Sequence, residues 1–248
     1  MTEYGTRAER EGLRAFFMDR AEDTLVNACL QGHTGRAAGN GDWAVLLAGD
    51  FAFLAGTPRR EALDWLDAEK RGLLILSGGE KWLALAAAYP RAAERGVRYG
   101  FSQPKSWDAD RLHALARNVP EGVEIRPMDG VLFSQCRGEE QLYDLCSAFE
   151  DMADFAAHGA GVLAVKDGRV LAGASTYAWE DGGIEVEIDT LPPYRRQGLA
   201  TACGAALILD CLKKGLRPHW DAANETSLRL ARRLGYPEPQ EYEVLEWQ

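Results

Sequence analysis

The chain has 248 residues, of which 46% are apolar, and a formal net charge of −10. This length allows one large domain or two of ordinary size, with enough apolar residues for a hydrophobic core. Residues 1–120 hold 16 basic and 16 acidic side chains, whereas residues 121–248 hold 12 basic and 22 acidic ones. An acidic second half repels nucleic acid and anionic lipid, so we expect neither as a partner, and it attracts small cations. A solvated acidic surface without a specific ligand is the alternative.

The sequence contains no targeting or metal-binding pattern. The N-terminal stretch is charged from Glu3 onward, and no apolar run is long enough to cross a membrane, which predicts a cytoplasmic protein. The five cysteines are scattered without CxxC pairs and predict buried thiols rather than disulfides. The four histidines also lack the spacing of metal ligands, so we expect no metal.

The first half is predicted to begin with an amphipathic helix over roughly residues 7–30. Asn40-Gly41 lies between short apolar runs and predicts a hairpin of strands at 36–39 and 43–48, because both turn residues must accept positive φ. A helix over 59–70, a strand over 72–77, a helix broken at Pro90 and a strand over 97–101 follow. We therefore expect a first domain over 1–105 and a connector with one short helix over 106–120.

The second half, residues 121–248, is predicted to form a second domain. It begins with an alternating strand over 122–129, followed by helices near 139–148 and 150–157. Two turns, Asp167-Gly168 and Asp181-Gly182, then predict a three-strand antiparallel meander. Both halves place a helical lead before a tight hairpin, then a strand, a helix and another strand. This similarity of pattern suggests an old duplication.

The stretch "PPYRRQGLATACGAALILDCLKKG" indicates an anion site. Leu199 to Lys214 is apolar nearly all round and predicts a buried helix that Gly215 caps. Residues 195–198 must therefore form the loop that enters this helix. A helix N-terminus presents unpaired amides, and Gly198 allows a ligand to approach the backbone closely. With Arg195 and Arg196 added, the loop is suited to bind phosphate groups.

The spacing of this loop excludes the common nucleotide-binding loops, because it matches neither the P-loop nor GxGxxG. The stretch "SGGEK" at 77–81 also fails the P-loop pattern and predicts only a turn into a helix.

Arg195-x-x-Gly198-x-Ala200 resembles the R/Q-x-x-G-x-G/A signature of the GNAT acyltransferases. The context is similar too: an apolar strand ending in "IDT", a proline turn, the long helix, and the strand "RPHWDA" before Asn224. More narrowly, "GIEVEIDTLPPYRRQGLATAC" with "PHWDAANETSLRLARRLGY" resembles the zwittermicin A resistance-type subgroup. The resemblance implies an α/β GNAT fold with a mixed, mostly antiparallel sheet flanked by helices. It also implies two tandem halves, of which the first is degenerate and lacks the signature where "LSGGEKWLAL" stands.

The resemblance further implies that acetyl-CoA is the co-substrate. In the family, backbone amides of the signature loop hold the pyrophosphate, the preceding strand pairs with the pantetheine arm, and an asparagine after the next strand bonds that arm. In this sequence the implied coenzyme residues are Ile188, Asp189, Thr190, Arg195, Arg196, Gln197, Gly198, Leu199, Ala200, Thr201, Asn224 and Ser227. The thioester is expected in a V-shaped slot between Asp189 and Trp220. From the residues alone, Asn224 also predicts an N-cap for the last helix, and both roles are compatible.

Three carboxylates alternate along the strand "IEVEIDT". The period of two places Glu185, Glu187 and Asp189 on one face. Crowding of like charges raises at least one pKa, which suits the base that an attacking ammonium requires. We predict Glu187 as the base or acceptor-orienting group, with Glu185 next; a solvent-facing strand side is the alternative.

The sequence departs from the family pattern at one catalytic position. Many members place a tyrosine seven residues after the asparagine to protonate the departing thiolate, and Ala231 stands there. Tyr236 and Ser227 are the nearby candidates for this role, and the sequence does not decide between them.

These observations predict an acetyl-CoA-dependent N-acetyltransferase that acts by direct transfer in a ternary complex on a small-molecule amine. An aminated antibiotic or polyamine-like metabolite fits the acidic second half, and a homodimer is left open. A module that binds acyl-CoA without turnover is the main rival, suggested by Ala231. A purely structural protein is the third hypothesis, and the intact signature loop at Arg195 to Ala200 disfavours it.

Overall fold

The computed structural model describes residues 1–248, which divide into two compact units. Unit 1 comprises Met1–Tyr99 and Glu241–Gln248, and unit 2 comprises Gly100–Gln240. These bounds differ from the expected ones because the last strand, β13 (Gln240–Trp247), pairs antiparallel with β5 (Leu74–Gly78) in unit 1. The Trp247 side chain is fully buried there, and its indole donates to the carbonyl of Ala86 at 3.2 Å. Burial of this apolar strand end therefore attaches the C-terminus to the first sheet.

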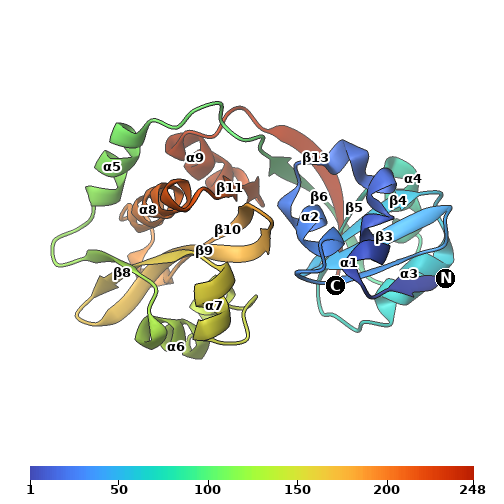
Figure 1. Ribbon diagram of the computed structural model, residues 1–248, viewed down its shortest axis with the longest axis horizontal. Helices are drawn as coiled ribbons and strands as arrows, with labels where there is room; N and C mark the ends of the chain where they lie inside the picture. Colours follow the sequence, from blue (N-terminus) through green and yellow to red (C-terminus); the bar gives the residue numbers. More distant parts are fainter. The chain divides into compact units, whose positions relative to one another are not determined.

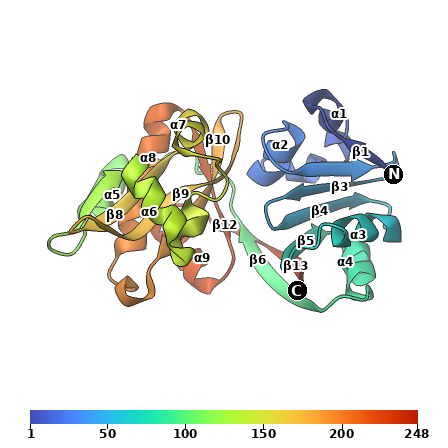
Figure 2. The same ribbon diagram turned by 90° about the horizontal axis from the view of Figure 1, so that it is seen from below.

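Unit 1 is built on one sheet with the strand order β1-β2-β3-β4-β5-β13-β6. The other bounds are β1 (Thr2–Tyr4), β2 (Arg36–Gly39), β3 (Trp43–Ala48), β4 (Phe51–Gly56) and β6 (Ala93–Gly100). The hairpin of β2 and β3 confirms the prediction from Asn40-Gly41. Helices α3 (Arg60–Asp67) and α4 (Glu80–Ala87) cover one face of this sheet (Figure 2), and their buried residues form one core with Trp43 and Leu54.

The opening helix is shorter than the sequence pattern predicted. The segment consists of α1 (Arg7–Glu11), the 3₁₀ helix η1 (Arg14–Arg20) and α2 (Thr24–Leu30). Phe17 leaves the helical region within η1, and the Asp23 carboxylate caps α2 by accepting from the Val26 amide at 3.1 Å. Because the Asp23 N-cap begins a new helix, the amphipathic pattern of residues 7–30 is divided among three separate segments instead of forming one helix. The stretch after Pro90 likewise forms β6 rather than more helix.

Unit 2 is built on a five-stranded sheet with the order β11-β10-β9-β8-β7. Its strands are β7 (Glu124–Pro127), β8 (Gly161–Lys166), β9 (Arg169–Glu180), β10 (Gly183–Thr190) and β11 (Arg217–His219). The antiparallel pairing of β8, β9 and β10 confirms the predicted meander. Helix α8 (Leu199–Lys214) lies on one face (Figure 1), with α5 (Ala109–Arg117) and α9 (Glu225–Leu234) packed against it. Because α5 packs on α8, the expected connector belongs to unit 2.

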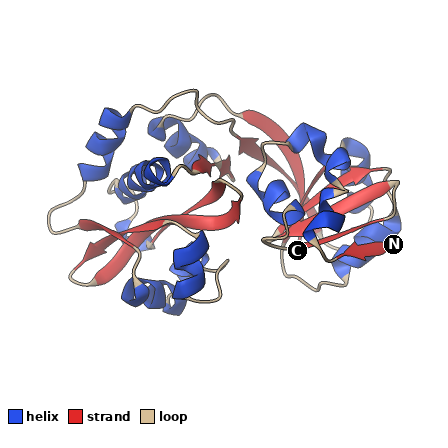
Figure 3. Ribbon diagram, in the orientation of Figure 1, coloured by secondary structure: helices blue, strands red, loops and turns tan.

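The opposite face of this sheet is covered by α6 (Gly130–Gly138), η2 (Glu140–Leu145) and α7 (Met152–His158) (Figure 3). The sequence pattern did not predict α6. Its N-cap is Asp129, whose carboxylate accepts from the amides of Val131 and Leu132 at 3.0 and 2.9 Å. The apolar and polar residues of this short helix are only weakly separated onto two faces. Its N-cap, rather than a periodic spacing of apolar residues, therefore marks where it starts.

The two units share one order of elements around a parallel strand pair. In unit 1, β4 is followed by α3 and the parallel strand β5; in unit 2, β10 is followed by α8 and the parallel strand β11. The unit 1 junction that corresponds to the loop of Arg195 to Gly198 is therefore Thr57-Pro58-Arg59. This corrects the placement at "LSGGEKWLAL", which instead joins β5 to α4; the corrected junction also lacks the signature.

None of the helices has both the length and the apolar character that a membrane span requires.

Candidate active site

The loop between β10 and α8 is held in an unusual backbone conformation. After the short 3₁₀ helix η3 (Pro192–Tyr194), Arg196 has φ +60° and Gly198 has φ +85°. Gly198 is the N-cap of α8 and provides no side chain to cap it. An L residue with a side chain is strained in this left-handed region, so the glycine is needed here for its conformation. The loop keeps the first turn of α8 open to a ligand.

Backbone amides at the start of α8 have no partner within the helix. The first amide that finds an intrahelical acceptor is that of Ala202, which donates to the Gly198 carbonyl at 3.0 Å. The loop itself is fixed by side chains, since Arg195 Nε donates to the Thr190 carbonyl at 3.1 Å. Gln197 Nε2 donates to the Pro193 carbonyl at 3.3 Å. The amides of residues 199–201 therefore form a fixed set of donors for an anion.

Strands β10 and β11 separate beside this loop. Their parallel pairing runs from Gly183 opposite Arg217 to Glu185 opposite His219 and ends there. On the other side, β9 stays paired with β10 as far as Thr190. The segment 186–190 thus presents one backbone edge that no strand of the sheet occupies. An extended ligand with amide groups is able to pair with such an edge.

One hydroxyl at the end of β10 lacks a partner. Thr190 Oγ1 is buried and makes no hydrogen bond. A buried polar atom without a partner costs free energy, and a ligand that supplies the bond removes this cost. The open amides, the free strand edge and this hydroxyl together fit an extended ligand with phosphates at one end, as coenzyme A has. The residues present therefore fit the expected co-substrate.

The carboxylates of β10 lie in different environments. Glu185 is 5% exposed, and its Oε2 lies 2.6 Å from His219 Nδ1. Glu187 makes only a bond to its neighbour, accepting from the Ile188 amide at 3.0 Å. Burial, with the nearby charges of Asp189 and Asp144, raises the pKa of Glu187 to about 8. Burial also raises the pKa of Asp189 to about 6, again with Asp144 adding to the rise.

The apolar residues of β10 face the other way, as the period of two predicted. Ile184, Val186 and Ile188 belong to the cluster that packs under α8 with Leu199 and Cys203. The carboxylate face is therefore directed to the α6 and η2 side of the sheet. The alternative of a solvent-facing strand side does not hold for Glu185, which is buried.

Asn224 caps α9, as the sequence predicted. Its Oδ1 accepts from the amides of Thr226 and Ser227 at 2.9 and 3.1 Å. The Ser227 hydroxyl accepts from Trp220 Nε1 at 3.1 Å. This bond fixes the Trp220 ring just beyond the point where β11 leaves β10. The nitrogen of the Asn224 side chain remains as a donor for a ligand.

Tyr236 lies in an aromatic cluster. Its ring contacts Phe101, Trp107 and Trp220, and its hydroxyl donates to the Pro218 carbonyl at 2.9 Å. Burial raises the pKa of this phenol well above its ordinary value. The geometry therefore favours a structural role over that of a proton donor to the thiolate. Ala231 is fully buried, so the position of the family tyrosine is filled by helix packing.

Two residues near the site were missed by sequence reasoning. His219 pairs with Glu185 across the strands, and Asp144 comes from η2, more than forty positions away along the chain. The strand "RPHWDA" was predicted, but its register beside β10 was not. That register alone would have placed His219 opposite Glu185. No signal in the sequence places Asp144 near Glu187, because that contact depends on how η2 packs on the sheet. No group of three or more His, Cys, Asp or Glu side chains has the geometry of a metal site.

A strand pair that splits beside an open helix N-terminus, with a buried carboxylate next to the split, is the arrangement that the sequence resemblance led us to expect of an acyltransferase. The chain belongs to the GNAT acetyltransferase family, because the sequence model of that family matches residues 14–245. It is an N-acetyltransferase of this family, in which acyl transfer depends on acyl-CoA.

Known relatives support the same assignment. A GCN5-related N-acetyltransferase-like protein of Streptococcus suis is 34% identical in sequence; the match covers 98% of this chain and 100% of that one, with a TM-score of 0.89. An uncharacterized N-acetyltransferase of Bacillus subtilis, YdfB, is 27% identical over 184 residues, which are 64% of this chain and 70% of the relative. A tandem GNAT protein from the clavulanic acid biosynthesis pathway shares the fold, with 15% identity, coverage of 98% and 94%, and a TM-score of 0.54.

Proposed function

We propose that the protein transfers an acetyl group from acetyl-CoA directly to the amine of a small molecule within a ternary complex. The observation that carries the proposal is the end of β10–β11 pairing at Glu185, which opens the sheet directly before Glu187. A thioester in this opening is within reach of the base candidate, and the α8 amides lie at the end of the same strand.

We propose that the coenzyme is bound chiefly through its phosphates. The amides of Arg196 to Thr201 and the Arg196 side chain, which makes no ion pair with the protein, are the donors for the pyrophosphate. Each charge-assisted hydrogen bond contributes about 1.5–3 kcal/mol, so several of them provide the principal anchor. The free edge of Ile188 to Thr190 and the Asn224 side chain then bind the pantetheine arm, whose amides supply matching groups. Acetyl-CoA supplies the activated acyl group.

Glu187 is proposed as the general base. An ammonium cannot attack a carbonyl, so one proton must leave the acceptor before or during attack. The Glu187 carboxylate takes that proton, the new C–N bond forms and the C–S bond breaks. The group that protonates the departing thiolate is not assigned to Tyr236. Because a thiolate is a good leaving group, water in the open slot suffices as its proton source.

The acceptor is proposed to carry more than one amino group. Asp144 from η2 and Asp189 on β10 both raise the pKa of Glu187 by their charges, and Asp144 also raises the pKa of Asp189. One ammonium carries a single positive charge and neutralises only one of these carboxylates. A polyamine-like metabolite or an aminated antibiotic supplies a second cation for the exposed Asp144.

Unit 1 is proposed to be a degenerate GNAT half, as in the zwittermicin A resistance-type subgroup. The shared order β4-α3-β5 and β10-α8-β11 supports this proposal. The loop after β4 is only three residues long, and α3 is half the length of α8, with 8 against 16 residues. Such a loop does not reproduce the coenzyme signature, so we propose one coenzyme site in the chain.

The rival function is a module that binds acyl-CoA without turnover, which the residue Ala231 favours. Release of free thiol from acetyl-CoA, measured with a panel of monoamines and polyamines, separates the two functions. Amine-dependent release supports the transferase. Coenzyme binding without release for any amine supports the binding module.

A further inference from the structure

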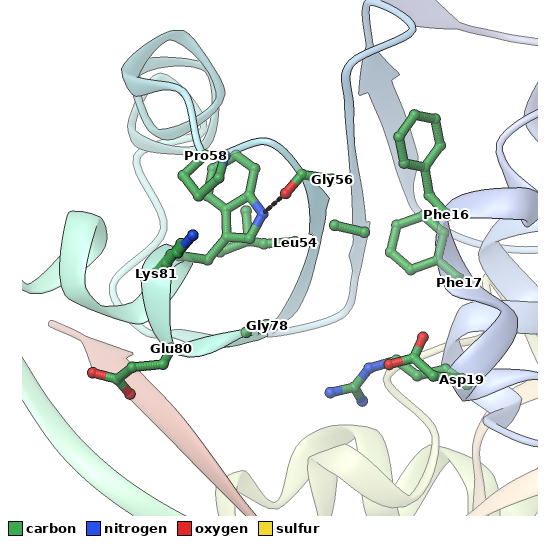
Figure 4. A pocket seen from close by; sticks show the side chains of 13 residues that line it. Phe16, Phe17, Asp19, Leu54, Gly56, Pro58, Gly78, Glu80 and Lys81 are labelled. Atoms are coloured by element: carbon green, nitrogen blue, oxygen red, sulfur yellow. Dashed lines mark hydrogen bonds between the residues drawn. The ribbon is translucent and has the colours of Figure 1, made fainter.

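A cavity of about 500 Å³ lies in unit 1, beside the turn "SGGEK" that the coenzyme site does not use (Figure 4). Its walls come from η1, the end of β4 and the start of α4. Both strands of the parallel pair β4 and β5 end here, at Gly56 and Gly78. A crevice beyond the carboxyl ends of parallel strands is where open α/β sheets bind ligands, and this volume is within the range of small-molecule sites.

Two apolar walls face each other across the cavity. Phe16 and Phe17 stand on one side and Pro58 on the other, and the charged Lys81 lies on the same side as Pro58 (Figure 4). The Trp82 ring completes the second wall, and its indole donates to the Gly56 carbonyl at 3.1 Å. Phe17 and Trp82 are each 2% exposed and support the two sides from within the core, whereas the half-buried Phe16 and Pro58 provide the apolar surface that a ligand can contact. The space between these two apolar surfaces suits a flat ring.

The charged groups of the lining favour an acid at one end of the ligand. Arg20 is 22% exposed and is held by the Ser77 hydroxyl and by Asp23 at 3.4 Å. Lys81 forms no ion pair with the protein. Glu80 bonds Arg95 at 2.8 Å, and its carboxylate points away from the aromatic residues (Figure 4). Asp19 is an exposed carboxylate at the rim on the opposite wall, beside Phe17 (Figure 4).

Gly79 leaves the cavity open at its polar end. It is the N-cap of α4 with φ −63° and ψ 158°, and it offers no side chain to the helix amides. The first amide that bonds within the helix is that of Trp82, to the Gly79 carbonyl at 2.8 Å, so the amides of Glu80 and Lys81 remain as donors. A Cβ atom at Gly79 would meet no atom within 4 Å. The first carbon of a side chain at Gly79 therefore finds open space, so an alanine is sterically accepted there.

We propose that this cavity binds a small aromatic carboxylate. The ring lies between Phe16 and Pro58, in front of the buried Phe17 and Trp82, and the carboxylate is bound by Lys81 and Arg20 with the α4 amides. The site uses none of the residues assigned to acetyl transfer, so it stands independently of the proposed function.

The test uses a pair of probes that differ in charge, phenylacetate and benzylamine, with the full chain. Binding is followed by NMR at the indole N–H of Trp82, which is identified by its loss in Trp82→Phe. Phenylacetate is expected to shift this signal in a saturable titration, and benzylamine to bind at least tenfold more weakly. An unmoved signal with millimolar phenylacetate, or equal binding of the two probes, overturns the proposal.

Two substitutions at Gly79 keep the test independent of folding. Gly79→Asp places a carboxylate on the α4 amides as an N-cap, which Asp favours, and is expected to leave the chain folded while weakening phenylacetate at least tenfold. Gly79→Ala adds only a methyl group and is expected to bind within threefold of the parent. The Arg196→Glu, Gly198→Asp variant is expected to bind phenylacetate unchanged. Equal loss of binding in the alanine and aspartate variants would contradict the assigned carboxylate position.

Discussion

Glu185 and His219 form the last residue pair between β10 and β11, with Oε2 and Nδ1 2.6 Å apart. The pair joins the two strands at the point where they separate. Because the His219 imidazole is paired with Glu185, it is not available to Glu187, which lies two residues further along β10 and has no basic partner. Burial, together with the charges of Asp189 and Asp144, raises the pKa of Glu187 to about 8, and for this reason we assign the base to Glu187 rather than to Glu185.

Replacement of the proposed base tests its role. Glu187→Gln keeps the size of the side chain and removes its proton affinity, so we expect kcat/KM to fall by about 10²–10⁴. Steady-state thiol release with a saturating amine measures the effect. Glu124→Gln, an exposed change on β7, is the control and should leave the rate unchanged. A loss of less than about threefold in Glu187→Gln would mean that another group or water takes the proton.

The pH dependence of the rate follows from the same carboxyl. Since the pKa of Glu187 is about 8, the base is mostly protonated at pH 7, and kcat/KM should rise as pH approaches 8. The rise measured with two acceptors of different amine pKa should keep one common inflection. Glu187→Gln should remove that inflection. An inflection that moves with the acceptor in the parent would assign it to the amine instead.

Stability should depend on pH in the opposite sense from most carboxyl groups. The pKa of Glu187 is raised from 4.5 to about 8 on folding, so the folded state binds its proton more tightly than the unfolded state. The free energy of unfolding therefore falls by about 1.4 kcal/mol per pH unit from this group between the two values, and the loss is complete above the folded pKa. Glu187→Gln should match the parent near pH 4.5 and exceed it at pH 9 in denaturant titrations. A constant difference between the two proteins across this range would contradict the raised pKa.

Tyr236→Phe separates a structural role from a catalytic one. Loss of the hydroxyl removes the bond to Pro218, while Gln103 Nε2 still donates to that carbonyl at 3.0 Å. We expect the free energy of unfolding to fall by about 0.5–1.5 kcal/mol and kcat/KM to stay within about threefold. A loss of activity without loss of stability would restore Tyr236 as the proton donor to the thiolate.

The signature loop and its surroundings were predictable because their signals are local. Gly198 is needed for its positive φ, the apolar run marks α8 with the bounds Leu199–Lys214, and Asn224 caps α9. The alternation along β10 likewise separated the carboxylates from Ile184, Val186 and Ile188. Each of these features depends on residues within one turn or one strand.

The remaining parts depend on contacts between distant segments. The attachment of β13 to unit 1 follows from burial of Leu245 and Trp247 among residues of α3 and α4, which no local pattern shows. The approach of Asp144 to Glu187 depends on the packing of η2 over the sheet. The placement of the unit 1 junction also required the strand pairing, since β4 and β5 had to be known as the parallel pair.

The helix N-terminus as the phosphate site is tested by two glycines at the two ends of α8. Gly198 and Gly215 have φ of +85° and +71°, so a side chain strains the backbone similarly at each. Gly198→Asp should abolish coenzyme binding, because it adds negative charge at the phosphate position. Gly215→Asp should keep binding, measured by isothermal titration calorimetry with coenzyme A. Equal affinity of the two variants would place the phosphates elsewhere.

The most direct measurement is thermal melting of the protein with acetyl-CoA, beside the Arg196→Glu, Gly198→Asp variant. Ligand at a hundred times its dissociation constant adds about 2.7 kcal/mol, which raises the Tm of a chain of this size by roughly 5–11 °C. We predict this rise for the parent protein and none for the variant. An unchanged Tm in the parent, or an equal rise in both, would contradict a coenzyme site at the loop of Arg195 to Gly198.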